Sequence, residues 1–169
     1  MSYVLAFCYF IMSEGAKLED IYKLIKDLSW NNPEHVQRDA VKELSNLKDE
    51  DVILLAKQSN DLCSKPCWDN AAIVLKNIGY PANAMALPYL MEWFQDITWP
   101  GVRPIITTLK DIETKILIPH IKNASISAIN ENDDCWANGL VYLIKELNLD
   151  QADFNNDKLF WKLEKIADR

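Results

Sequence analysis

The sequence predicts an all-α fold, an α-solenoid of about four helical hairpins preceded by N-terminal helices, and three observations support this prediction. Apolar residues recur at the spacing of amphipathic helices, and no segment alternates with period two for long enough to form a sheet. Only four of the 169 residues are glycines, which disfavours a β-rich fold with many glycine turns. An internal period of 31 residues is the third observation, since stacked hairpins of that length bury their apolar faces against one another.

The composition is typical of one globular domain, residues 1–169, with an excess of negative charge. Hydrophobic residues make up 49% of the 19.5 kDa chain and charged residues 25%, which favours a folded core over disorder. The 18 basic and 25 acidic residues give a net charge of −7. This charge disfavours nucleic acid as a partner, because phosphate groups need a basic surface. It favours a basic protein or peptide.

The N-terminal segment, residues 1–15, contains ten consecutive apolar positions from Tyr3 to Met12. This run is shorter than the roughly 20 residues that cross a bilayer, so no membrane partner is expected. No Lys or Arg precedes the run and no small-residue cleavage site follows it, so a secretory signal is disfavoured. We expect a buried first helix here, a repeat region over residues 16–169, and a cytoplasmic protein.

Tryptophans, aliphatic residues and prolines carry the 31-residue period. Six positions have a counterpart of the same type 31 residues later: Trp68 and Trp99, Leu75 and Ile106, Ile78 and Leu109, Leu87 and Ile118, Pro88 and Pro119, and Leu90 and Ile121. The period extends backwards only to the apolar positions Ala40, Leu44 and Leu47. Trp136 follows Trp99 by 37 residues, and we interpret the polar stretch 130–134 as the loop insertion that lengthens this step.

The N-terminal helices and the first hairpin precede the first tryptophan of the period. Apolar residues spaced three and four apart from Leu18 to Leu28 predict an amphipathic helix. Pro33 is suited to the start of a helix, which we expect to extend to about Leu47. The second helix of this hairpin is expected over residues 51–62.

The second hairpin carries the strongest signals. A stripe that begins at Trp68 predicts a helix over residues 68–78, and Gly79 and Pro81 end it. Glycine can adopt a positive φ at a helix end, and proline cannot continue the helix. A partner helix is expected over 83–96 with Pro88 in its first turn, where a missing N–H costs little.

The third and fourth hairpins follow the same pattern. Asp96 or Thr98 is expected to cap a helix over 99–109, whose partner lies over 116–129. In the fourth hairpin, Asp134 precedes a helix over 136–147. A closing helix is expected around 158–168.

Two stretches resemble a small bacterial family of uncharacterised HEAT-like (armadillo-like) proteins, a domain of unknown function. They are Trp-Asp-Asn-Ala-Ala-Ile-Val-Leu-Lys-Asn-Ile-Gly-Tyr-Pro at 68–81 and Leu-Pro-Tyr-Leu-Met-Glu-Trp-Phe-Gln-Asp-Ile-Thr-Trp-Pro-Gly at 87–101. The resemblance is weaker over the rest of 28–147. It implies a right-handed α-solenoid of HEAT-like hairpins whose second helices line a concave face. It implies no catalytic residue, because the family has no established activity.

The candidate binding residues are Asp69, Glu92, Trp93, Asp96 and Trp99. Glu92 and Asp96 are one helical turn apart, so their carboxylates are expected on one face, extended by Asp69 of the neighbouring hairpin. Trp93 lies at the border of the apolar stripe and is expected to be partly exposed. The alternative interpretation is structural: Asp96 caps the next helix, Glu92 is solvated, and Trp99 packs in the core like the other tryptophans of the period.

Catalysis, cofactors and metals have little support in the sequence. It contains no glycine-rich phosphate loop, no Gly-x-Ser-x-Gly motif and no paired metal-ligand motif, and we expect no cofactor. Cys63 and Cys67 have no second pair with which to bind zinc, and they are interpreted as ordinary thiols rather than as a disulfide. His35 and His120 each lie near a proline at a helix start, so they are expected to decorate helix ends.

These observations favour a non-catalytic module whose acidic surface binds a basic protein or peptide. One specific form is a bacterial immunity-type protein that neutralises a basic toxin. An enzyme of the HEAT-like DNA glycosylase type is the main rival, and the acidic chain disfavours it because such enzymes need a basic face for DNA. A small-ligand pocket lined by Trp93 and Trp99 is a further alternative.

Overall fold

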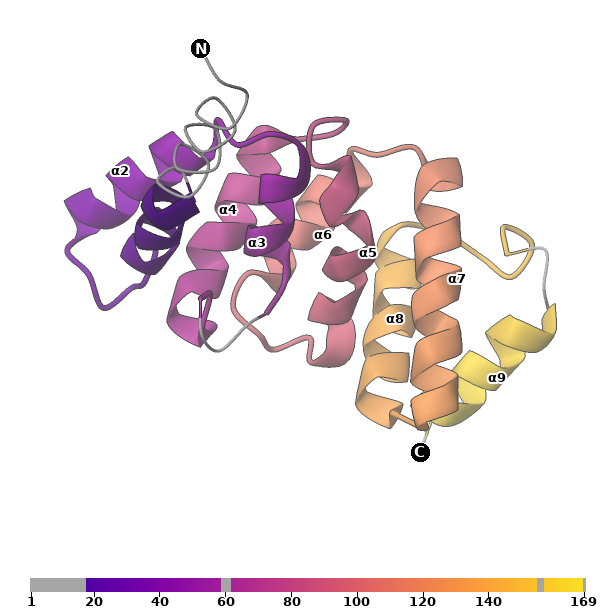
Figure 1. Ribbon diagram of the computed structural model, residues 1–169. Helices are drawn as coiled ribbons and strands as arrows, with labels where there is room; N and C mark the ends of the chain where they lie inside the picture. Colours follow the sequence, from indigo (N-terminus) through magenta and orange to yellow (C-terminus); the bar gives the residue numbers. More distant parts are fainter. Residues whose placement is uncertain (1–17, 59–61, 155–156, 169) are drawn as a thin grey trace, which may run out of the picture.

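The computed structural model describes residues 18–58, 62–154 and 157–168, and every regular element within these ranges is a helix (Figure 1). This confirms the all-α class. The helix expected within residues 1–15 lies outside the described residues. Within the described ranges, no helix is both long and apolar enough to span a bilayer.

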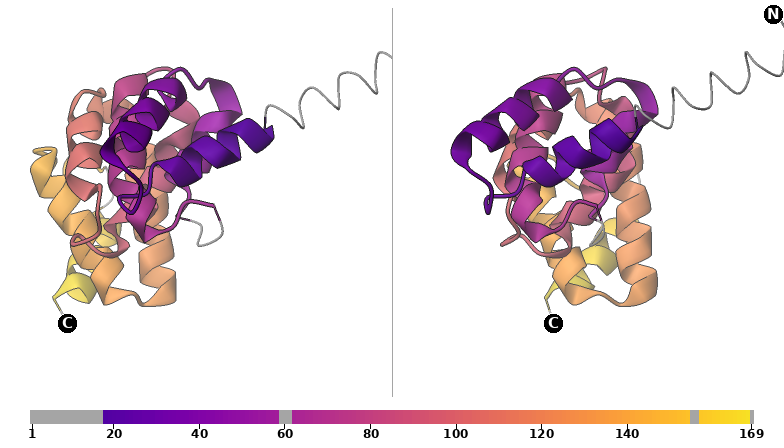
Figure 2. Two further views of the ribbon diagram at one scale, coloured as in Figure 1. Left: turned by 90° about the vertical axis from the view of Figure 1, so that its left-hand side faces the viewer. Right: turned by 60° about the vertical axis from the view of Figure 1, so that its left-hand side comes forward.

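The helices follow one another across the molecule from the N-terminal pair to the C-terminal helix (Figure 1). After a helix over residues 18–27, the elements, with η denoting a 3-10 helix, are α2 (Glu34–Leu44), η1 (Asp49–Val52), α3 (Ile53–Ala56), η2 (Lys65–Cys67), α4 (Trp68–Ile78), η3 (Ala84–Ala86), α5 (Leu87–Leu90), η4 (Met91–Gln95), α6 (Val102–Lys110), α7 (Thr114–Glu131), α8 (Asp134–Glu146) and α9 (Asp157–Ala167). The end-on views of Figure 2 place the N-terminal pair in front of the elements that follow it. α4 packs against α2, α3 and α6, and α8 packs against η4, α7 and α9, so one apolar core continues along the molecule.

The first predicted hairpin is only partly correct. The helix over 18–27 buries Ile21 and Ile25, as its apolar spacing predicts, but α2 ends at Leu44 rather than near Leu47. The single helix expected over 51–62 is wrong, because η1 and α3 together end at Ala56. The Ala56 carbonyl accepts the indole N–H of Trp93 at 2.8 Å, so a tertiary bond forms where the helix ends.

The helix predicted over 68–78 is confirmed as α4. Its apolar stripe is buried, including Ala71 and Leu75. Gly79 ends the helix with φ of 66°, and its N–H donates to the carbonyl of Leu75 at 3.2 Å. The stop signal in the sequence is therefore the one the chain uses.

The helix predicted to begin at Trp99 begins instead at Val102, as α6. Asp96 does not cap it, because one Asp96 carboxylate oxygen accepts the N–H and the hydroxyl of Thr98 at 2.8 and 2.6 Å. Gly101 occupies the N-cap with φ of 87°, and a Cβ there would lie 2.5 Å from the Trp93 ring. The chain needs glycine at this turn both for its φ and for the close approach of that ring.

The partner helix predicted over 83–96 is divided into η3, α5 and η4, with Pro88 in the first turn of α5 as expected. The hydrogen bonds of 3-10 helices have poor geometry, so tertiary contacts compete readily for their carbonyls. The Met91 carbonyl accepts the indole N–H of Trp136 at 3.0 Å, and the Phe94 carbonyl lies against Gly139. Packing of η4 against α8 accounts for the departure from one continuous helix.

The C-terminal helices follow the prediction with shifted ends. α7 is longer than the expected 116–129 and contains Pro119 in its interior. α8 begins two residues before Trp136, and its N-cap is Asp133 rather than Asp134. The Asp133 carboxylate accepts the N–H of Trp136 at 2.8 Å. α9 matches the predicted closing helix.

The tryptophans of the period pack against the core. Trp68 and Trp136 are buried, and the half-buried Trp99 lies 5.0 Å from Trp68 between ring centroids. Trp93 has 0% of its surface exposed, so the expectation of partial exposure is wrong. Its ring centroid is 6.1 Å from that of Trp68. The indole is buried because its N–H reaches the carbonyl that ends α3.

Candidate functional site

A pocket of about 450 Å³ lies where the chain leaves η4 and meets the start of α8. We call it the acidic pocket, and it is lined by Gln95, Asp96, Ile97, Asp134, Cys135, Asn138 and Ala167. The lining comes from the end of η4 with the segment after it, the first turns of α8, and the end of α9. Ile97 is 43% exposed, so the pocket joins an apolar side chain to two carboxylates.

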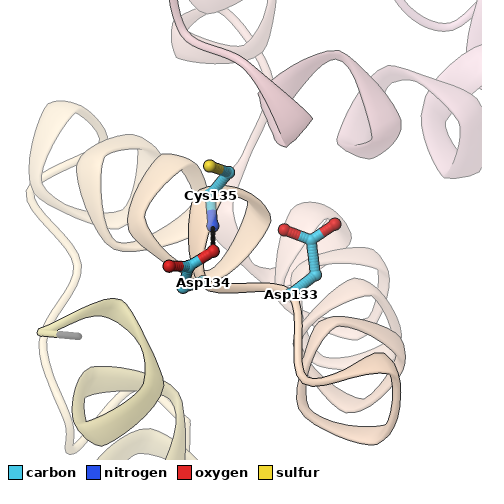
Figure 3. Close-up of side chains that lie close together, drawn as sticks. All are labelled: Asp133, Asp134 and Cys135. Carbon is cyan, nitrogen blue, oxygen red and sulfur yellow. Dashed lines mark hydrogen bonds between the residues drawn. The ribbon is translucent and has the colours of Figure 1, made fainter.

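Local hydrogen bonds position both carboxylates of this pocket. The bonds from the Thr98 hydroxyl and N–H hold Asp96 in place and lower the pKa of its carboxyl. Asp134 lies in the first turn of α8, and one of its oxygens accepts the N–H of Cys135 at 2.9 Å (Figure 3). Acidic residues favour this position because the start of a helix carries partial positive charge.

The exposed Cys135 thiol lies in the acidic pocket, where the neighbouring carboxylates affect its pKa. Its pKa is raised, chiefly by the charge of Asp134, with further contributions from Asp133 and Asp96. Negative charge opposes formation of a thiolate, so these neighbouring carboxylates disfavour ionisation of Cys135. The pocket is therefore suited to a cation.

Asp133, Asp134 and Cys135 are a group of described residues that could offer ligands to a metal ion (Figure 3). Their ligand atoms lie within 4.8 Å of one another. The three residues are consecutive in the chain and Asp133 already caps α8, whereas a structural zinc site converges four ligands. The arrangement fits a helix start with acidic residues at least as well as it fits a metal site.

A second pocket has a volume of about 290 Å³. It is lined by Glu92 and His120, together with Pro88, Asn123, Ala124, Ser127 and Trp136. Burial raises the pKa of Glu92, which nearby Lys57 lowers and nearby Glu131 raises further. Burial also lowers the pKa of His120. Burial thus shifts the pKa of both groups toward the neutral form.

The structure separates the five candidate residues. Glu92 and Asp96 line different pockets, because η4 ends at Gln95 and the backbone of Asp96 is extended, so the two residues do not share one helix face. Asp69 is exposed in the first turn of α4 and lines neither pocket. Trp93 is in the core, and Trp99 packs on Trp68.

Sequence reasoning did not identify Asp134, Cys135 or His120 as pocket residues. The sequence indicates Asp134 only as a helix start signal and predicts His120 at a helix end. His120 lies inside α7, and its spacing from Asn123, Ala124 and Ser127 places these four residues on one helix face. That spacing was visible in the sequence, but nothing there indicated what the face packs against.

The family described as a domain of unknown function, DUF5071, matches residues 65–169, which is more than half of the chain. The chain belongs to the DUF5071 family. The matched residues include both pockets, whereas the N-terminal helices and α3 precede them. Comparisons with curated proteins and with solved structures found no match. The expectation of an uncharacterised family is confirmed, and its HEAT-like and bacterial parts stay predictions.

Proposed function

We propose that this DUF5071 protein is a non-catalytic, HEAT-like module of α-solenoid type that binds a basic segment of a protein or peptide. The acidic pocket is the proposed contact, and one observation carries the proposal: Asp96 and Asp134 border a pocket of about 450 Å³ together with the exposed Ile97. A lysine or arginine side chain has the matching chemistry. Its aliphatic stem would pack on Ile97 and its charged head would lie between the carboxylates.

The hydrogen bonding of the two carboxylates supports this assignment. One oxygen of Asp96 is used by Thr98, and one oxygen of Asp134 is used by the N–H of Cys135. A carboxylate has about four acceptor sites, so each of the two has sites left beyond these bonds and beyond the contact of the Asp134 side chain with the Cys135 thiol. An incoming ammonium or guanidinium group can therefore be accepted without breaking the bonds that hold the loop and the helix start.

The net charge of the chain, −7, adds a long-range contribution. It accelerates encounter with any basic partner and is screened by salt, whereas contacts inside the pocket act mainly on dissociation. The two contributions are separable, because the first responds to charge anywhere on the surface and the second only to the pocket.

The test is the binding of a fluorescein-labelled oligoarginine peptide, followed by fluorescence anisotropy at low and at physiological salt. The variant Asp96→Asn/Asp134→Asn should weaken binding by about tenfold or more, which corresponds to about 1.4 kcal/mol. Glu19→Gln/Glu34→Gln is the matched control, because it removes the same charge from exposed positions on the N-terminal helices. An equal loss in both variants, or no binding by the wild type, would contradict the proposal.

A further inference from the structure

The second pocket brings together polar side chains from two elements. Glu92 belongs to η4, and His120, Asn123 and Ser127 belong to α7. The three α7 residues are spaced three and four apart, so they lie on one face of that helix. α7 packs against both η4 and α8, and it lies beside α8 in Figure 1. This packing places the polar face of α7 and the Glu92 carboxylate around one pocket.

These four polar side chains are not used to hold the fold together. Within the part of the chain that the structure describes, none of them forms a hydrogen bond or an ion pair with another residue. Ser125 shows the contrast on the same helix, because its hydroxyl donates to the Ile121 carbonyl at 2.8 Å. The four side chains offer a carboxylate, an imidazole, a primary amide and a hydroxyl, all of which accept hydrogen bonds. The pocket therefore contains several acceptors without a donor from the described chain.

Apolar surface and access to solvent complete the pocket. Trp136 and Ala124 form its buried part, whereas Pro88 and Asn123 are exposed. The indole N–H of Trp136 donates to the Met91 carbonyl at 3.0 Å, so this tryptophan offers apolar surface to the pocket. The volume of about 290 Å³ is near the lower end for pockets that bind small molecules, roughly 300–1,000 Å³.

The charges around Glu92 favour a ligand with a single positive charge. Burial lowers the pKa of His120, so its imidazole is neutral at neutral pH and keeps one acceptor nitrogen. Lys57 and Glu131 act on the Glu92 carboxyl with opposite signs. The Lys57 ammonium is also engaged elsewhere, since its nitrogen lies 4.8 Å from the centroid of the Tyr89 ring. Glu92 thus provides the net charge of the pocket.

We propose that this pocket binds a small primary amine with an apolar carbon body. The ammonium group donates to the Glu92 carboxylate and to acceptors on the polar face of α7. The carbon body packs on Trp136 and Pro88. Burial disfavours the ionised Glu92 carboxylate, and an ammonium group beside it restores the stabilisation that water supplies at the surface. None of these residues lines the acidic pocket, so this proposal does not depend on the proposed function.

The test is isothermal titration calorimetry with 2-phenylethylamine at millimolar concentrations and neutral pH. The full chain carries Asp96→Asn/Asp134→Asn, because the acidic pocket would also attract an ammonium group. We expect saturable binding of one amine per chain. Two probes separate the contributions: 2-phenylethanol keeps the carbon body without the charge, and the trimethylammonium analogue keeps the charge without an N–H donor. Both should bind about tenfold more weakly or worse.

Variants in the same background locate the site. Glu92→Gln keeps the size of the side chain and should weaken binding by about tenfold or more. Asn123→Ala should weaken it by a smaller factor, without unfolding the protein, because Asn123 is exposed. Glu19→Gln is the matched control, since it removes one exposed charge from the N-terminal helix.

Three results would overturn the proposal. The first is the absence of saturable 2-phenylethylamine binding. The second is binding of the trimethylammonium analogue as tightly as the amine, which would mean that charge alone attracts the ligand. The third is an equal effect of Glu92→Gln and Glu19→Gln, which would place the bound amine outside this pocket.

Discussion

At the scale of single residues, the pKa of a glutamate carboxyl is shifted in opposite directions at two positions, Glu146 and Glu92. Glu146 forms an ion pair with Lys110 at 2.6 Å, and this ion pair lowers the pKa of the Glu146 carboxyl. Glu92 instead lies in a pocket where burial raises its pKa. The sequence presents both residues as helix-surface glutamates, and only packing distinguishes them.

Glu92→Gln should increase the free energy of unfolding at neutral pH. The folded-state pKa of Glu92 is raised above its ordinary value of 4.5, so the folded protein binds this proton more tightly than the unfolded chain. The resulting stability is present below pH 4.5 and is lost as the pH rises through the folded-state pKa. In urea unfolding between pH 4 and neutral pH, the difference in unfolding free energy between the variant and the wild type should therefore decrease as the pH falls.

Glu146→Gln is the control of opposite sign. Its folded-state pKa is lowered below 4.5, so the ionised form contributes stability above that pH, which is lost as the pH falls through the folded-state pKa. The variant should be less stable than the wild type at neutral pH, with the difference vanishing toward acid. If the two glutamine variants shift stability in the same direction at neutral pH, the assignment for Glu92 is wrong.

At the scale of elements, the sequence predicts the helices that carry local signals, but it does not predict where helices end or break early. The Trp68 stripe with Gly79 after it located α4, and the apolar spacing in the last residues located α9. The breaks at η4 and α3 depend on indole N–H groups of Trp136 and Trp93, which lie 45 and 37 residues from the carbonyls they reach. Helix propensity and hydrophobic periodicity depend on neighbouring residues, so neither predicts a hydrogen bond between residues far apart in the sequence.

The same limit applied to the candidate site. Charge and the tryptophan-rich segment indicate residues 92–99, of which Glu92 lines one pocket and Gln95, Asp96 and Ile97 line the other. The second wall of each pocket comes from α7, α8 or α9, and a single sequence does not specify which helix faces which. A continuous α-helix over 83–96 would place Glu92 and Asp96 on one face, but η4 ends at Gln95 and the extended backbone of Asp96 separates them.

Gly139→Ala should destabilise the protein, although Ala is the better helix former. In an exposed helix interior this substitution stabilises by about 1 kcal/mol. Here a Cβ at position 139 would overlap the Phe94 carbonyl oxygen and approach its carbon to 2.9 Å, so η4 and α8 would have to separate. We expect a loss of about 2–3 kcal/mol in urea unfolding, as for other overpacked cores. A gain in stability would show that α8 does not approach η4 this closely.

At the scale of the whole molecule, the N-terminal pair is attached to the DUF5071 region through α4 and the turn before it. The Trp30 N–H donates to the Pro66 carbonyl at 3.0 Å. The Asn70 side-chain amide donates to the Leu28 carbonyl at 2.7 Å and to the Gln37 side chain at 2.8 Å. The matched residues begin at 65, so these bonds join the helices before the match to the first helix within it. Asn70 thus connects both N-terminal helices to the rest of the chain.

Asn70→Ala should loosen the N-terminal pair selectively. The substitution leaves the part-buried Leu28 carbonyl and the Gln37 side chain without their donor, which costs about 1–3 kcal/mol. Because the bonds join only the pair to α4, hydrogen exchange followed by mass spectrometry should quicken in residues 18–44 and stay unchanged in α7 and α8. Asn77→Ala is the matched control on the same helix, since it removes one exposed bond, to Ser45 at 3.2 Å. Uniform quickening across the chain would instead mean that the pair and the DUF5071 region unfold as one cooperative unit.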